Sequence, residues 1–179
     1  MHPPTETAVI IEVPAAEHVV GGHRARWDRA AGWGVPAHVT VLYPFVPPDE
    51  IDEAVLSTLA AAVSSVPRFT ATWQRTGWFE EEVLWLAPEP EEAFRALTTA
   101  VARAFPDHPP YGGAFADVIP HLTVGHDATP GELRAAEREI LARLPVSMEV
   151  AAAALWRGTP EPSSWQPVTA LPLGEPPRG

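Results

Sequence analysis

Two short segments of the chain carry the same arrangement of chemically useful side chains. Residues 38–41 read "HVTV" and residues 121–124 read "HLTV". In each segment a histidine is followed two positions later by a threonine, with aliphatic residues between and after them. Among the seven histidines of a chain of this composition, chance predicts well under one match to such a pattern. The repeat is therefore a candidate for one catalytic site made of two halves.

These residue types suit chemistry at phosphorus. Two imidazoles on either side of a phosphodiester can divide the work: one removes a proton from the attacking oxygen and the other donates a proton to the leaving oxygen. An unperturbed imidazole titrates near pH 6.5, so both protonation states are available near neutral pH. Each threonine hydroxyl can donate a hydrogen bond to a non-bridging oxygen, where charge accumulates in the transition state. We expect no cofactor and no metal to be required.

Both motifs are predicted to lie on strands. Because side chains alternate along a strand, His38 and Thr40 share one face and His121 and Thr123 share another, opposite their aliphatic neighbours. Further strands are predicted at 7–13, in two segments of 68–88 around Gly77 and the acidic turn 80–82, at 146–158 and at 165–173. Helices are predicted at 15–30, 50–64 with Asp49 as N-cap, 90–105 and 131–144.

The predicted strands are interleaved with helices, in a cycle that runs about twice. This order indicates an α+β fold. We expect residues 1–179 to form a single domain of two lobes, each contributing one motif, with a tail that frays from 174 to 179. A polar pair beside a buried strand needs a partner or a cavity, and a central cleft between the lobes would provide one.

The composition limits the classes of function. The formal net charge is −11, every basic residue is arginine, and there is no cysteine. This excludes disulfides and cysteine nucleophiles, and it disfavours nonspecific binding of long nucleic acids, which depends on basic residues. The first residues lack the basic and apolar regions of a signal peptide, and no apolar run approaches the length of a membrane span. We expect a soluble, cytoplasmic, monomeric protein.

The paired motifs resemble the signature of the two-histidine phosphoesterase superfamily. The segments "GVPAHVTVLYPF", "PYGG" (residues 110–113, with Tyr111) and "VIPHLTVGH" resemble segments of its 2′-5′ RNA ligase-like branch. The resemblance implies a bilobal, pseudo-symmetric fold with two antiparallel-rich sheets flanking a central cleft. It also implies that His38 and His121 are the catalytic pair, that Thr40 and Thr123 bind phosphate, and that the substrates are 2′,3′-cyclic phosphates of nucleotides or RNA ends.

Several residues near the motifs are further candidates. Tyr43 and Tyr111 are candidates for stacking on a base, with core packing as the alternative for each. Of three neighbouring arginines, Arg26 is predicted to bind the substrate phosphate, while Arg24 and Arg29 are assigned to a helix surface. Neither His108 nor His126 has the spacing of a metal ligand set.

The sequence leaves three activities open. The first is a metal-independent phosphoesterase that opens cyclic phosphates. The second is a binding module for nucleotides or RNA ends that keeps the site without turnover. The third is 2′-5′ ligation of RNA ends by the same site. The sequence does not indicate which histidine is the base and which is the acid.

Overall fold

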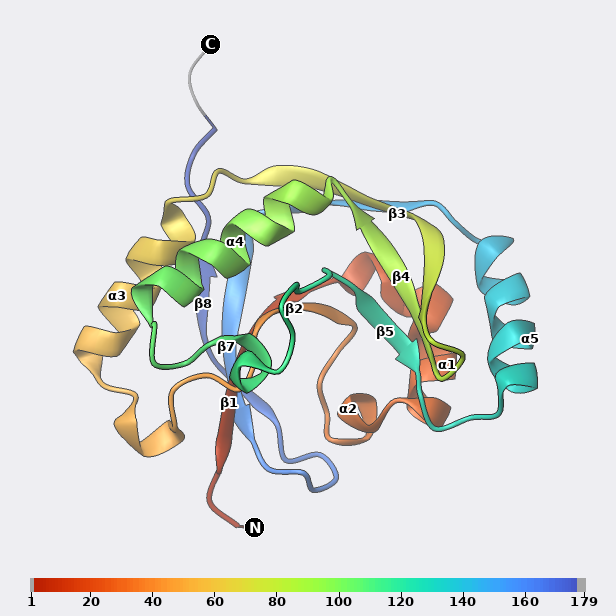
Figure 1. The fold of residues 1–179 in the computed structure, drawn as a ribbon, viewed down its shortest axis with the longest axis horizontal. Helices are drawn as coiled ribbons and strands as arrows, with labels where there is room; N and C mark the ends of the chain where they lie inside the picture. The colour runs from red at the N-terminus through yellow and green to blue at the C-terminus, as the bar shows by residue number, and fades with distance from the viewer. Residues whose placement is uncertain (1, 177–179) are drawn as a thin grey trace.

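Two antiparallel sheets of four strands form the framework of the protein (Figure 1). The computed structural model describes residues 2–176. The first sheet has the order β2-β1-β7-β8 and the second the order β5-β4-β3-β6. The strands of the first sheet are β1 (Glu6–Glu12), β2 (His38–Leu42), β7 (Ala152–Gly158) and β8 (Gln166–Pro172). Those of the second are β3 (Phe69–Phe79), β4 (Val83–Glu89), β5 (Leu122–Gly125) and β6 (Val146–Val150). The predicted α+β fold with two antiparallel sheets is confirmed.

Two of the helices pack on the sheet to which they are not joined along the chain. The helices are α1 (Glu17–Trp27), α2 (Arg29–Gly32), α3 (Glu53–Ser64), α4 (Glu91–Ala104) and α5 (Pro130–Leu141), with 3-10 turns η1 (Pro14–Ala16), η2 (Pro48–Glu50) and η3 (Pro110–Gly113). Helix α1 follows a strand of the first sheet but packs on β5, whereas α4 follows a strand of the second sheet but packs on β2. Each sheet is therefore covered in part by a helix that follows a strand of the other sheet.

One continuous core lies beneath both sheets. It contains Ile11 of the first sheet, Trp73 and Leu86 of the second, Leu97 of α4 and Ile140 of α5, all fully buried. A smaller apolar cluster, which includes Ile10, Trp156 and Trp165, covers the other face of the first sheet. Burial on this scale is the main favourable contribution to folding.

The helix predicted over 15–30 is interrupted. Helix α1 ends at Trp27 because Asp28 adopts an extended conformation (φ −118°, ψ 113°) and its carboxylate accepts a hydrogen bond from the N–H of Ala30. Asp28 is thus the N-cap of the short helix α2. The glycines at 21 and 22 do not break α1.

The other differences from the predictions lie at element ends. Asp52, not Asp49, caps α3, since its carboxylate accepts from the N–H of Val55 at 2.8 Å; Asp49 lies in η2. Residues 146–158 form two strands in different sheets, separated at Ala151. The acidic segment 80–82 forms the hairpin turn between β3 and β4 as predicted, whereas Gly77 lies inside β3 and does not divide the two strands.

The tail predicted to fray from 174 begins with ordered residues. The N–H of Gly174 donates to the carbonyl of Val66 at 2.9 Å, and its own carbonyl accepts from the N–H of Arg68. Positions 177–179 lie outside the described residues. Within residues 2–176, no helix is long and apolar enough to cross a membrane.

Candidate active site

The two motifs lie on strands that meet. Strand β2 is an edge strand of the first sheet, β5 is an edge strand of the second, and the two contact each other. His38 begins β2, and His121 immediately precedes β5.

The predicted alternation holds in both motifs. Val39 and Val41 are buried, as are Leu122 and Val124, while each histidine and each threonine remains partly exposed. We call the exposed side of these segments, with His38, Thr40, His121 and Thr123, the motif face.

Both imidazoles are held by the same hydrogen bond. Nδ1 of His38 lies 2.8 Å from the carbonyl oxygen of Pro36, and Nδ1 of His121 lies 2.8 Å from that of Ile119. A carbonyl oxygen only accepts, so each Nδ1 carries a proton. Nε2 is therefore the atom of each ring that can exchange a proton with a ligand, as a base when bare and as an acid when protonated.

Aromatic side chains fix the His121 ring from one side. Phe79 meets it edge to face, with ring centroids 4.8 Å apart, and Trp85 lies 6.1 Å away. Trp85 pairs with Thr123 on one side and with Gly77 on the other. The Trp85 ring covers Gly77 so closely that a Cβ there would lie 2.3 Å from it. The missing side chain of Gly77 thus makes room for the wall behind His121.

The pKa values of both histidines are lowered. Burial lowers the pKa of His38 to about 4, and the charge of Arg24 adds to the effect. Burial also lowers the pKa of His121. The charge of His121 makes a smaller contribution to the lowered pKa of His38.

Tyr111 reaches the first motif, whereas Tyr43 does not turn toward the histidines. The Tyr111 hydroxyl contacts Thr40, a contact that lowers its pKa against the larger raising effect of burial. The backbone of Tyr111 is left-handed (φ 52°), and its N–H donates to the carbonyl of Tyr43 at 2.6 Å. The Tyr43 hydroxyl donates to Glu6, and its ring packs beside Trp165. Burial, with the charge of Glu6, raises the pKa of Tyr43 to about 12.

Arg24 is buried, contrary to its predicted place on the helix surface, whereas Arg26 is exposed. Arg26 is exposed on α1, and its guanidinium lies 4.6 Å from the centroid of the Trp27 ring. Trp27 packs against Gly125, at the end of β5 that is remote from His121. Arg24, assigned to the surface from sequence, is only 2% exposed and lies behind His38. Arg29 is at the surface as predicted, in an ion pair with Asp127.

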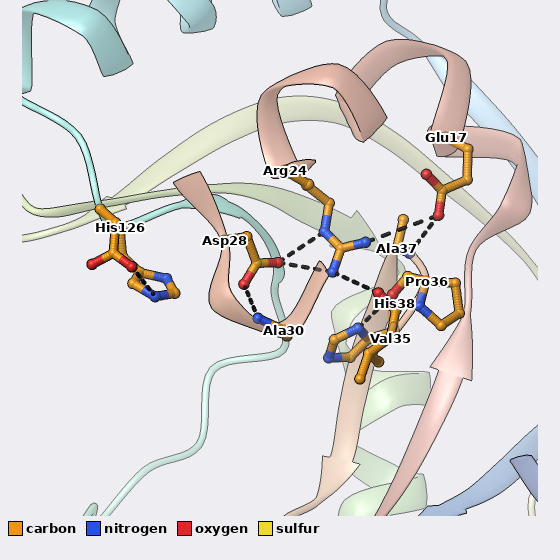
Figure 2. Close-up of polar contacts among 10 residues, drawn as sticks. Glu17, Arg24, Asp28, Ala30, Val35, Pro36, Ala37, His38 and His126 are labelled. Carbon is orange, nitrogen blue, oxygen red and sulfur yellow. Dashed lines mark hydrogen bonds and ion pairs between the residues drawn. The ribbon is translucent and has the colours of Figure 1, made fainter. Parts of the chain in front are cut away.

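Figure 2 shows the polar groups behind His38. Arg24 lies between Asp28 and Glu17. Arg24 and Glu17 each bond to the backbone of residues 35–37, which leads into the first motif. Sequence reasoning missed this network. The i, i+4 spacing of Arg24 and Asp28, which favours an ion pair on a helix, was the available signal.

Phe115 was also missed by sequence reasoning. Its side chain is 63% exposed, and its ring meets the edge of Tyr111 with centroids 5.6 Å apart. Phe115, together with the half-buried Tyr111 that contacts Thr40, offers apolar ring surface beside the motif face.

Other parts of the structure fit phosphate chemistry less well. A surface cavity of about 660 Å³ is lined by Arg75 but also by Glu89, Glu91 and Glu92, and this excess of carboxylates disfavours an anion. Within residues 2–176, no cluster of three or more His, Cys, Asp or Glu side chains is placed to hold a metal ion.

Comparison with known proteins assigns the family. The model of the family described as the 2′-5′ RNA ligase superfamily matches residues 12–161, which include both motifs. The chain belongs to the 2′-5′ RNA ligase superfamily. Membership in a superfamily described by RNA ligase activity supports an enzymatic role. None of the curated proteins matches the chain.

Solved structures with the same fold share little sequence with this member of the 2′-5′ RNA ligase superfamily. LigT of E. coli complexed with NADP+ is 18% identical, with a TM-score of 0.60 over 97% of this chain and 100% of LigT. A protein solved as a phosphoesterase is 18% identical, with a TM-score of 0.61 over 97% and 100% of the two chains. TT0787 of Thermus thermophilus is 17% identical, with a TM-score of 0.56 over 95% and 98%. The confirmed fold therefore extends over nearly the whole chain.

Proposed function

We propose that the protein is a metal-independent phosphoesterase that opens 2′,3′-cyclic phosphates of nucleotides or RNA ends. The observation that carries this proposal is the matched pair of imidazoles. The two histidines stand at the starts of adjoining edge strands, both donate from Nδ1 to a backbone carbonyl, and both keep Nε2 for a ligand. A phosphodiester between them meets a proton acceptor on one side and a proton donor on the other.

The reaction balances with water as the only co-reactant. One Nε2 takes a proton from water as its oxygen forms a bond to phosphorus. The bond from phosphorus to one ribose oxygen breaks, and the other Nε2 gives that oxygen a proton. Thr40 and Thr123 donate hydrogen bonds to the non-bridging oxygens, whose negative charge increases in the transition state. The product is a phosphate monoester on one ribose oxygen.

The residues beside Thr40 support a nucleotide as the substrate. Tyr111 and the exposed Phe115 form an aromatic pair against which a base can stack. LigT of E. coli has been crystallised with 3′-AMP, with ATP and with NADP+, all of them small nucleotides. The net charge of −11 favours ligands of that size over long polyanions.

The test is hydrolysis of a 2′,3′-cyclic nucleotide in excess EDTA. We expect turnover by the wild-type protein and a loss of about 10²-fold to 10⁴-fold in kcat for His38→Ala and for His121→Ala. His126→Ala is the matched control, since His126 is a nearby histidine outside both motifs, and it should retain wild-type turnover.

Three other results would each change the conclusion. Loss of turnover in EDTA would contradict a metal-independent reaction. Nucleotide binding without turnover would favour the binding module. Joining of RNA ends without hydrolysis of the cyclic nucleotide would favour ligation by the same site.

A further inference from the structure

Within residues 2–176, a buried cation lies behind only one of the two proposed catalytic histidines. Arg24 is 2% exposed, and burial of a guanidinium is costly unless its charge and its donors are satisfied. Asp28 supplies the opposite charge: Nε of Arg24 donates to Oδ2 at 2.9 Å, and Nη2 lies 2.8 Å from the same oxygen. Nη1 lies 3.9 Å from Oε1 of Glu17.

This ion cluster holds the backbone that enters the first motif. Nη2 of Arg24 donates to the carbonyl of Val35 at 3.2 Å, and Oε1 of Glu17 accepts from the N–H of Ala37 at 2.6 Å (Figure 2). The carbonyl of Pro36, between these two anchors, is the group that accepts from Nδ1 of His38. The direction of the His38 ring thus depends on a peptide segment that is fixed on both sides.

The surroundings of His121 differ. Its ring also donates to a backbone carbonyl, but it packs against the rings of Phe79 and Trp85. Aromatic rings oppose a positive charge far less than a guanidinium does. The two imidazoles are therefore equivalent in their hydrogen bonds and unlike in their electrostatics.

We propose that Arg24 is a positioning residue that fixes the His38 ring and keeps it neutral, so that His38 is the general base and His121 the general acid. This inference rests on the proposed cyclic phosphodiesterase reaction. In each turnover His38 takes the proton of the attacking water, and His121 gives its proton to the leaving ribose oxygen. Exchange of one proton with solvent at each ring restores the starting state.

The charges around His38 agree with this assignment. Burial and the charge of Arg24 lower its pKa, as does His121, while the carboxylate of Asp28 and the hydrogen bond to Pro36 act in the opposite direction. Glu12 pairs with His38 across β1 and β2, and its carboxylate accepts from the indole of Trp156 at 2.9 Å. Burial lowers the pKa of His121 without a cation beside it.

The experiment is an NMR titration of the two imidazoles in the free protein, with signals assigned through His38→Gln and His121→Gln. In the wild-type protein we expect His38 to protonate at a lower pH than His121. In Arg24→Met, the midpoint of the His38 titration should rise by about one pH unit or more, because the cation is lost and two carboxylates are left unbalanced. Arg24→Lys keeps the charge and should keep a low midpoint.

Asp28→Asn separates an electrostatic role from a merely structural one. The carboxylate of Asp28 raises the pKa of His38, whereas the guanidinium of Arg24 lowers it. Removal of that carboxylate should therefore not raise the midpoint of the His38 titration. A wild-type His38 that titrates at or above His121 would overturn the assignment, even if Arg24→Met does not fold. An unchanged midpoint in a folded Arg24→Met, or a rise in both Arg24→Met and Asp28→Asn, would overturn the role of Arg24.

Kinetics distinguish this proposal from the one on which it rests. If the wild-type protein hydrolyses no cyclic phosphate, the proposed function fails, whereas the titration still tests how Arg24 acts on His38. If hydrolysis is present and the titration order is reversed, the function stands and the assignment of base and acid fails.

Discussion

At the scale of single residues, the threonines are expected to act in the transition state rather than in folding. Thr40→Val and Thr123→Val keep the shape of the side chain but remove the hydroxyl donor. We expect each to lower kcat for cyclic nucleotide hydrolysis by about 10²-fold, as for the loss of one donor to a developing oxyanion.

Thr169→Val is the control for these two variants. Thr169 is a partly exposed residue of β8, outside both motifs. It should leave kcat unchanged, and all three proteins should unfold at similar urea concentrations. A motif variant with full activity, or one that loses activity only in proportion to its stability, would contradict a role in phosphate binding.

A second residue-scale prediction concerns pH. The reaction requires one neutral and one protonated imidazole. Activity should therefore fall as pH decreases through the pKa of His38, at about 4, and as pH increases through that of His121, which burial holds below its ordinary value. We expect a bell-shaped profile of kcat/KM, which reports the free protein, with its maximum below pH 6.5. A profile that rises to a plateau above pH 7 would be inconsistent with both pKa values.

The residue pattern of the motifs was predictable because it depends only on the alternation of side chains along a strand. The placement of Arg24 was not. Arg24, Arg26 and Arg29 are close in sequence, and one is buried, one stacks on Trp27 and one pairs with Asp127. Their roles depend on which side of α1 meets β5 and on the bend at Asp28. Neither feature can be predicted from one amino-acid sequence alone.

At the scale of elements, the wall behind His121 depends on one glycine. Gly77→Ala would place a methyl group 2.3 Å from the Trp85 ring. Trp85 would have to move, and it contacts both Phe79 and His121. We expect a loss of about 1–3 kcal/mol in the free energy of unfolding, measured in urea, and a lower kcat.

The same substitution in a helix provides the comparison. Gly131 lies in α5, and a Cβ there meets nothing within 4 Å. Gly131→Ala should leave kcat unchanged and the protein at least as stable as the wild type, because alanine favours the helix. Equal behaviour of the two variants would show that the contact between Gly77 and Trp85 does not support the site.

Most elements were predictable from the spacing of apolar residues, but their assignment to sheets was not. The run 146–158 has no glycine or proline before its last residue, and yet it divides at Ala151 between the two sheets. The chain thereby returns to the first sheet, so that β7 and β8 complete the sheet that holds His38. Pairing between strands so distant along the chain leaves no local signal.

At the scale of the whole molecule, charge is expected to limit the size of the substrate. The protein has a formal net charge of −11 and no lysine. Long RNA would be repelled, whereas a cyclic mononucleotide carries a single negative charge at its phosphate. We expect kcat/KM for a cyclic mononucleotide to exceed that for a long RNA ending in the same cyclic phosphate, and the difference to narrow as salt is added. A strong preference for the long RNA at low salt would contradict this expectation.

The central claim is that His38 and His121, from different sheets, act on one phosphorus atom. The most direct measurement compares kcat/KM for cyclic nucleotide hydrolysis in EDTA among His38→Ala, His121→Ala and the double variant. Residues that act as a unit are strongly non-additive. We predict that the double variant is no more than about tenfold slower than the slower single variant. Losses that multiply in the double variant would show that the two histidines act independently, and would contradict the account.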